Sequence, residues 1–157
     1  MSDAEAAPGG PGIEPTWSSS AKDIVGASLG PARLWFTIGH GIVNEVYFPR
    51  VDMPQIRDLG FIVADDTGFW CEVKRLGNYR LETPTPGIPA AHIVHTHERF
   101  TLTLRIAGDP QRDALLLEVS LAGDTTLRPY VLLASHIDGS GYDNVAEAVT
   151  HGTRRVL

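Results

Sequence analysis

Cysteine is nearly missing from this sequence, and so are clusters of basic residues and long apolar stretches. The single Cys71 excludes an internal disulfide and a cysteine-rich zinc site. Lys and Arg number 13 against 19 Asp and Glu, and the resulting net charge of -6 makes nucleic acid a poor partner. No stretch is long enough for a membrane span, and the N-terminus lacks the pattern of a secretory signal. We therefore expect a cytoplasmic protein with neither a membrane nor a nucleic-acid partner.

Helical periodicity is also scarce, whereas glycine and proline are frequent, with 16 and 11 residues. These residues interrupt the chain often and count against a helical bundle. Hydrophobic residues make up 43% and charged residues 20%, both close to the average of globular proteins. A chain of 157 residues is long enough for one domain, or for part of a larger one.

Residues 1–15 differ in composition from the remainder of the chain. They are rich in Pro and Gly and contain almost no large apolar side chain. Such a composition buries too little surface to offset the entropy of ordering, so we predict a disordered leader there. Aromatic and β-branched residues begin at Trp17, and residues 16–157 are expected to form the folded domain.

The clearest strand pattern lies in the middle of the chain. Apolar residues alternate with polar ones over residues 100–106, and the pattern returns over residues 115–121. Because successive side chains of a strand point to opposite faces, each segment predicts one apolar and one polar face. The residues Ala-Gly-Asp-Pro at 107–110 favour a turn, which predicts a hairpin over residues 99–121.

Further short strands are predicted over residues 33–38, 42–48, 59–64, 69–74, 91–96 and 130–135, and one short helix over residues 144–149. Short strands joined by Gly, Pro and Asp turns are typical of an all-β antiparallel sandwich or barrel. Residues 154–157 resemble the start of one more strand, which would have no partner. We therefore expect a sheet that is incomplete at its C-terminal end.

The densest group of polar side chains lies between two apolar runs. Its members are His40, Asn44, Glu45, Tyr47, Arg50 and Asp52. Two interpretations stay open: the group faces a sugar or a partner domain, or its members make ordinary hydrogen bonds beside a turn. Strict alternation would place residues 44, 46 and 48 on one face of a strand and residues 43, 45 and 47 on the other. Two carboxylates across a turn are an unspecific signal for a glycosidase, so we assign no catalytic residue.

Three histidines, His92, His95 and His97, follow each other closely, as metal ligands can. On a strand His95 and His97 share a face from which His92 points away, and no carboxylate or Cys completes a familiar set. We predict surface or turn histidines and no metal site. Residues 138–144 resemble a calcium loop only loosely and predict a Gly-rich turn, and we expect no cofactor.

The three tryptophans, Trp17, Trp35 and Trp70, allow two interpretations. Aromatic faces can stack on sugar rings, but in a small β-sandwich they more often fill the core. We expect these side chains in the core, together with Cys71 as a small apolar residue.

Several segments resemble a known family. The motif W-F-T-x-x-H-G-x-x-N-E-V-Y-x-P-R-x-D over residues 35–52 is long and specific. Together with residues 11–23, 57–60, 109–116 and 130–137, it is similar to bacterial glucodextranases and glucoamylases of glycoside hydrolase family 15. The resemblance covers the chain from about residue 11 to its end.

This resemblance implies a fold and a context. In that family the region is an N-terminal antiparallel supersandwich, similar to galactose mutarotase, which precedes an (α/α)6 barrel. The barrel hydrolyses α-glucosidic bonds with inversion and supplies both catalytic glutamates. The resemblance therefore implies a partial sandwich without the barrel and without catalytic residues, inactive alone, whose partners are the barrel and an α-glucan or α-glucoside.

Two other functions stay open. A free-standing carbohydrate-binding module would need an exposed aromatic platform. A protein-interaction role would use an unpaired sheet edge, because such edges recruit further strands.

Overall fold

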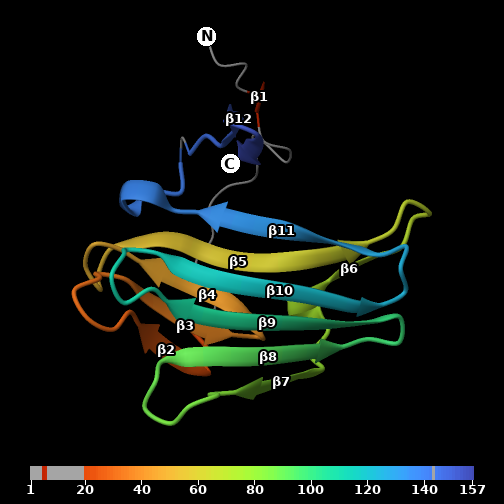
Figure 1. Ribbon diagram of the computed structural model, residues 1–157, viewed down its shortest axis with the longest axis horizontal. Coiled ribbons are helices and arrows are strands. Elements are labelled where there is room, and N and C mark those ends of the chain that lie inside the picture. The colour runs from red at the N-terminus through yellow and green to blue at the C-terminus, as the bar shows by residue number, and fades with distance from the viewer. Residues whose placement is uncertain (1–4, 7–19, 143) are drawn as a thin grey trace.

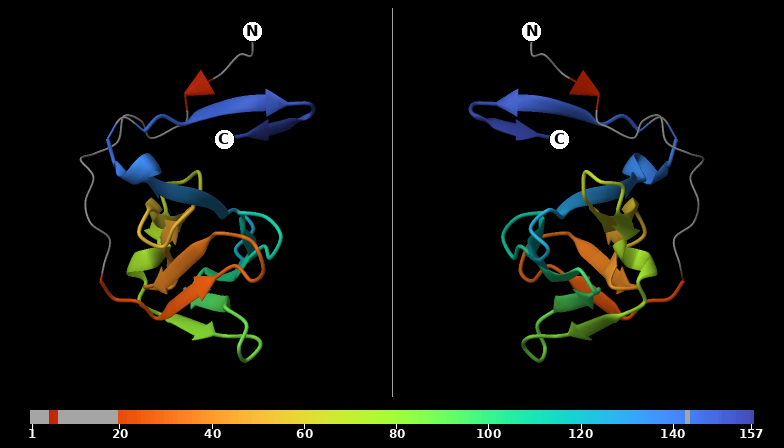
Figure 2. Two further views of the ribbon diagram at one scale, coloured as in Figure 1. Left: turned by 90° about the vertical axis from the view of Figure 1, so that its left-hand side faces the viewer. Right: turned by 90° about the vertical axis from the view of Figure 1, so that its right-hand side faces the viewer.

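The computed structural model describes residues 5–6, 20–142 and 144–157 (Figure 1). Two antiparallel sheets stack face to face as a β-sandwich, and a small three-stranded sheet lies beyond one side of it (Figure 1, Figure 2). The predicted all-β antiparallel sandwich is confirmed. The leader predicted over residues 1–15 lies outside the described residues, except for Glu5–Ala6 (β1).

The larger sheet has six strands in the order β11-β5-β4-β3-β2, with β6 paired to β5. The strands are β2 (Ile24–Ala27), β3 (Trp35–Gly39), β4 (Ile42–Tyr47), β5 (Pro54–Ala64), β6 (Trp70–Glu72) and β11 (Arg128–Ser135). The sequence patterns did not predict β2. Gly26 of this strand packs against the Phe36 ring, since an added Cβ atom would lie only 2.3 Å from it. A glycine therefore stands where an apolar side chain would show the strand pattern in the sequence.

The smaller sheet has four strands in the order β10-β9-β8-β7. The strands are β7 (Tyr79–Glu82), β8 (Ala90–Thr96), β9 (Phe100–Gly108) and β10 (Leu115–Gly123). The predicted hairpin is confirmed, because β9 and β10 pair from Leu115↔Gly108 to Gly123↔Phe100. The patterns missed the short strand β7.

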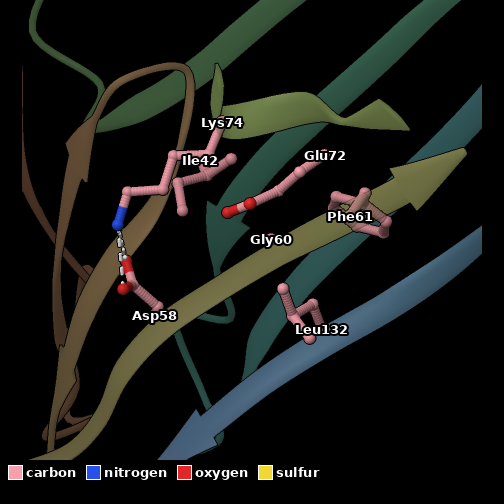
Figure 3. A pocket seen from close by; sticks show the side chains of 7 residues that line it. All are labelled: Ile42, Asp58, Gly60, Phe61, Glu72, Lys74 and Leu132. Atoms are coloured by element: carbon pink, nitrogen blue, oxygen red, sulfur yellow. Dashed lines mark hydrogen bonds and ion pairs between the residues drawn. The ribbon is translucent and has the colours of Figure 1, made fainter. Parts of the chain in front are cut away.

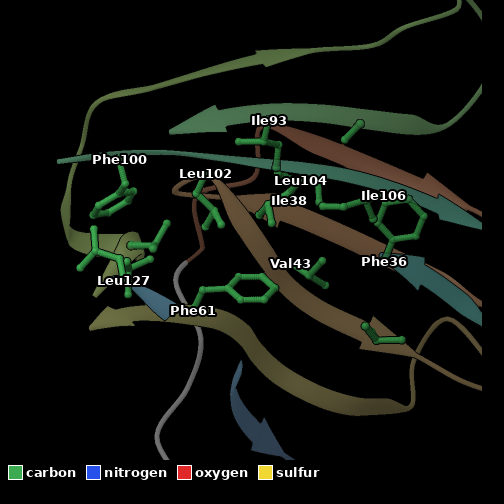
Figure 4. Packing of buried hydrophobic residues seen from close by; sticks show 14 of the residues in the cluster. Phe36, Ile38, Val43, Phe61, Ile93, Phe100, Leu102, Leu104, Ile106 and Leu127 are labelled. Carbon is green, nitrogen blue, oxygen red and sulfur yellow. The ribbon is translucent and has the colours of Figure 1, made fainter. Parts of the chain in front are cut away.

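The hydrophobic core lies between the two sheets. Figure 4 shows side chains of both layers meeting there, with Phe36 and Phe61 from the larger sheet and Leu102 and Leu104 from the smaller one. All four are buried. Cys71 packs against this core, as predicted. The apolar faces that alternation assigned to residues 100–106 therefore form one wall of the core.

A β-bulge in β4 changes which side chains face the core. Thr37 pairs with Glu45 but Ile38 pairs with Val43, so Asn44 is an extra residue in the strand. Val43 and Val46 consequently both face the core. The prediction that they lie on opposite faces is wrong, because it assumed an unbroken alternation.

The C-terminal segment forms a hairpin of β12 (Glu147–His151) and β13 (Arg154–Val156), and β12 also pairs with β1. The helix predicted over residues 144–149 is wrong, since the β-branched Val149 and Thr150 lie in a strand. The prediction of an unpaired terminal strand is wrong too, because β13 pairs with β12. The helical elements in the described residues are two short 3₁₀ turns, Val73–Arg75 (η1) and Ile137–Gly139 (η2), and no helix there could cross a membrane.

Arg99 connects three turns at one end of the sandwich. Its guanidinium pairs with Asp65 of the β5–β6 turn at 2.9 Å and with Asp124 of the β10–β11 turn at 2.6 Å. It also lies over the ring of Phe69, 4.4 Å from the centroid. Hydrogen bonds from Arg99 and Thr126 lower the pKa of Asp124 to about 2.

Replacing Arg99 with glutamine should raise the pH at which the chain unfolds in acid. The ordinary pKa of Asp124 is 3.8, so its contribution to stability is complete above about pH 4 and is lost as the pH falls toward about 2. Without the guanidinium the pKa returns toward 3.8 and this contribution shrinks. Circular dichroism across the acid range gives the midpoint. Arg105→Gln, which breaks the exposed pair with Glu118, is the control, and equal shifts in both variants would contradict the expectation.

Candidate functional site

The first predicted site residue, His40, lies in the two-residue turn between β3 and β4. His40 and Gly41 both have positive φ, 54° and 73°, which is the geometry of a type I′ hairpin turn. The turn is held from the other sheet, because His95 Nε2 donates a hydrogen bond of 2.7 Å to the Gly41 carbonyl. His40 itself is exposed at the tip of this turn.

The three histidines of residues 92–97 do not form a unit. His95 is fully buried, and burial lowers its pKa, so the neutral ring is favoured. His97 stacks on Phe100 with the two ring centroids 4.8 Å apart. His92 Nδ1 lies 3.9 Å from a carboxylate oxygen of Glu82. The prediction of a surface histidine is wrong for His95, because its ring packs beside the Gly41 turn and donates through Nε2 to the Gly41 carbonyl. No cluster of metal ligands occurs in the described part of the chain.

Glu45 is the centre of a polar cluster on the outer face of the larger sheet. One of its oxygens, Oε2, accepts hydrogen bonds from Thr37 Oγ1 at 3.1 Å and from Tyr47 OH at 2.9 Å. Lys22 Nζ lies 3.2 Å from the same oxygen. Burial, and then the bond to Glu45, raise the pKa of Tyr47 to about 12. The cluster therefore joins neighbouring strands and keeps Tyr47 protonated.

Asn44 and the pair Arg50 and Asp52 lie elsewhere. Asn44 is fully buried at the bulge. Arg50 and Asp52 face each other in the exposed β4–β5 turn through two hydrogen bonds of 3.0 and 2.6 Å. The bond from Arg50 is the main reason for the lowered pKa of Asp52.

The predicted residues thus fall into separate groups along one strand rather than into one pocket. His40 and Arg50 flank the two ends of β4, a strand of six residues that spans about 20 Å. Direct contacts join two pairs, Glu45 with Tyr47 and Arg50 with Asp52. These residues are close in sequence but the groups are not close in space, because an extended strand places each residue about 3.3 Å further along than the one before it.

A shallow hollow on the outer face of the larger sheet was not predicted. Gly60 of β5 lies at its floor, between Glu72 and Leu132, as Figure 3 shows. Lys74 Nζ is 2.9 Å from both carboxylate oxygens of Asp58 and closes one end. In the sequence, the small residue Gly60 between larger residues is the one indication of this hollow. The strand order is needed to show which residues lie on its two sides.

Comparisons with known proteins agree with this fold. A family described as "Glucodextranase, domain N" matches residues 7–157. A glucoamylase of Clostridium sp. (strain G0005) is 28% identical over 155 residues, which are 94% of this chain and 22% of that protein. A crystal structure of a bacterial glucoamylase complexed with acarbose superposes with a TM-score of 0.81 at 24% identity, over 96% of this chain and 25% of that one. The chain therefore spans about a quarter or less of these relatives.

Proposed function

Because the chain belongs to the glucodextranase domain N family, we propose that it serves as a non-catalytic N-terminal β-sandwich of a glucoamylase- or glucodextranase-like α-glucosidase. In this role it packs against a catalytic (α/α)6 barrel and supports it. The remaining length of the relatives leaves room for such a barrel.

One side of the sandwich supports this proposal most strongly. β10 and β11 are the last strands of their sheets, and we call the side of the sandwich that they form the seam. Val119 of β10 and Val131 of β11 pair with residues of the core faces, Leu104 and Phe61, yet they are 37% and 65% exposed. Side chains that point toward a core but remain in solvent are typical of a surface that further protein covers.

On the opposite side of the sandwich a hydrogen bond joins the two sheets. Tyr79 of β7 donates this bond of 2.9 Å to Asp23 beside β2. This contrast between the two sides supports the seam as the surface that packs against more protein. The predicted groups around Glu45, and at Arg50 and Asp52, are further candidates for a domain interface or a sugar-facing surface.

Activity measurements test this proposal. The purified chain should not hydrolyse maltose, dextran or trehalose. When the chain replaces the matching segment of the Clostridium glucoamylase, the hybrid should recover activity that the enzyme loses when that segment is deleted. Turnover by the chain alone, abolished by Glu45→Ala, would overturn the proposal. A hybrid no more active than the deletion variant would contradict the supporting role.

A further inference from the structure

The outer face of the larger sheet carries two exposed aromatic rings. Cys71 of β6 packs on the core, so its neighbours Trp70 and Glu72 point outward. In β11, Val131 pairs with the core residue Phe61, so Tyr130 points outward as well. Trp70 is 67% exposed and Tyr130 is 50% exposed. The prediction that Trp70 fills the core is therefore wrong.

The two rings stand on opposite sides of one strand. Trp70 pairs with Ala64 of β5, and Tyr130 pairs with Ile62 of the same strand. With strands about 4.8 Å apart and about 3.4 Å per residue, the Cα atoms of Trp70 and Tyr130 lie about 12 Å from each other. This separation suits an extended ligand of several rings better than one small molecule.

Between them lies the outer face of β5, where the outward residues are Ala64, Ile62 and Gly60. We call this strip of sheet surface, from the two aromatic rings to the hollow beside Glu72, the trough. Figure 3 shows the end of it that contains the hollow. Gly60 is not required by the backbone, since its φ is not positive and an added Cβ atom would lie 3.4 Å from Ile42 Cδ1, an ordinary contact. The backbone would accept a larger residue at position 60, so the glycine there keeps the hollow open without being required for folding.

The polar groups of the trough are paired charges. Asp58 pairs with Lys74, and Glu72 pairs with Arg75. Together they offer carboxylate acceptors and ammonium and guanidinium donors without a large excess of one charge. Such a surface complements a neutral ligand rich in hydroxyl groups rather than an ion. Trp and Tyr rings supply the flat apolar faces on which the C–H faces of pyranose rings stack.

We infer that this trough, bounded by Trp70 and Tyr130, is a binding site for a glucose oligosaccharide. The chemistry of the trough identifies a neutral sugar chain, and the α linkage rests on the proposed function. The site lies apart from the Glu45 cluster and adds substrate contact to a domain whose proposed role is structural. It holds a chain of sugar units along β5 without acting on them.

Titration of the full chain with maltoheptaose and isomaltoheptaose tests the inference, with cellohexaose as the β-linked comparison. The indole N–H signal of Trp70, assigned by its loss in Trp70→Ala, should shift and saturate. Trp70→Ala and Tyr130→Ala should each weaken binding about tenfold. Gly60→Leu should weaken it by filling the hollow. Tyr142→Ala, which removes a comparably exposed ring outside the sheets, should bind as the unchanged protein does.

Two results would overturn the inference. One is the absence of a saturable shift at about 10 mM sugar, where even a weak site fills. The other is equal affinity in Trp70→Ala and the unchanged protein. Binding of cellohexaose as tight as that of the α-linked sugars would overturn the α linkage. These outcomes are independent of the hybrid enzyme, so a failure of the supporting role leaves the sugar measurement intact, and the reverse also holds.

Discussion

Replacing Gly41 with alanine is expected to destabilise the fold by about 2–5 kcal/mol. Part of this cost is the backbone strain of a non-glycine residue in the left-handed region, and the rest is overpacking by the added Cβ atom. Gly41 has a φ of +73°, and an added Cβ atom would lie 2.4 Å from His95 Cε1 and 3.0 Å from Tyr79 Cγ. His95 cannot move aside easily, since it is fully buried and bonded to the Gly41 carbonyl. Urea unfolding at neutral pH measures the loss.

Gly77 provides the matched control for this prediction. Its φ of +66° is close to that of Gly41, but no heavy atom lies within 4 Å of an added Cβ atom. Gly77→Ala therefore isolates the backbone strain and should cost only about 1–2 kcal/mol. Equal losses at the two glycines would show that the contact with His95 contributes nothing, which would contradict the packing described for this turn.

The regular parts of the sandwich follow directly from the sequence. Where an apolar residue recurs at every second position, as over residues 100–106, the strand, its buried face and its hairpin partner are all predictable. The pattern is this clear because β9 lies in the interior of its sheet and presents one whole face to the core. Nothing in that stretch interrupts the ladder.

The predictions fail where the alternation is interrupted or reversed. The bulge at Asn44 moves Val46 to the core face, and the sequence does not reveal it, because the extra residue is defined by its pairing with β3. His95 is buried although it is polar, because one carbonyl satisfies its donor. The bulge depends on how β4 pairs with β3, and the burial of His95 depends on a contact between residues 54 positions apart, and local patterns contain neither.

The candidate site shows the same limit. The motif of residues 35–52 led to the family, which the comparison confirms, but it did not define a pocket. Trp70 and Tyr130 come from strands that are neighbours of β5 on its two sides, and strand order alone brings them to one face. An exposed tryptophan could not be distinguished from a core tryptophan by sequence, because both occur in apolar strands.

The seam predicts a contrast between two leucines of the chain. Leu104 is fully buried in β9, and Leu104→Ala should cost about 2–5 kcal/mol, since it removes apolar contacts and leaves a cavity. Leu133 of β11 pairs with Leu59 beside the core but is 44% exposed at the seam. In the chain alone, Leu133→Ala should therefore cost less than about 1 kcal/mol. Urea unfolding of both variants gives the two values.

The same substitution should behave differently once the seam is covered. In the hybrid with the Clostridium glucoamylase, added protein that packs against β11 would bury Leu133, and the cost of Leu133→Ala should rise toward the range of a core leucine, about 2–5 kcal/mol. Leu104→Ala should cost the same in both proteins, because its surroundings do not change. If Leu133→Ala still costs less than about 1 kcal/mol of unfolding free energy in an active hybrid, the seam is not the contact surface. Another face of the sandwich must then support the barrel.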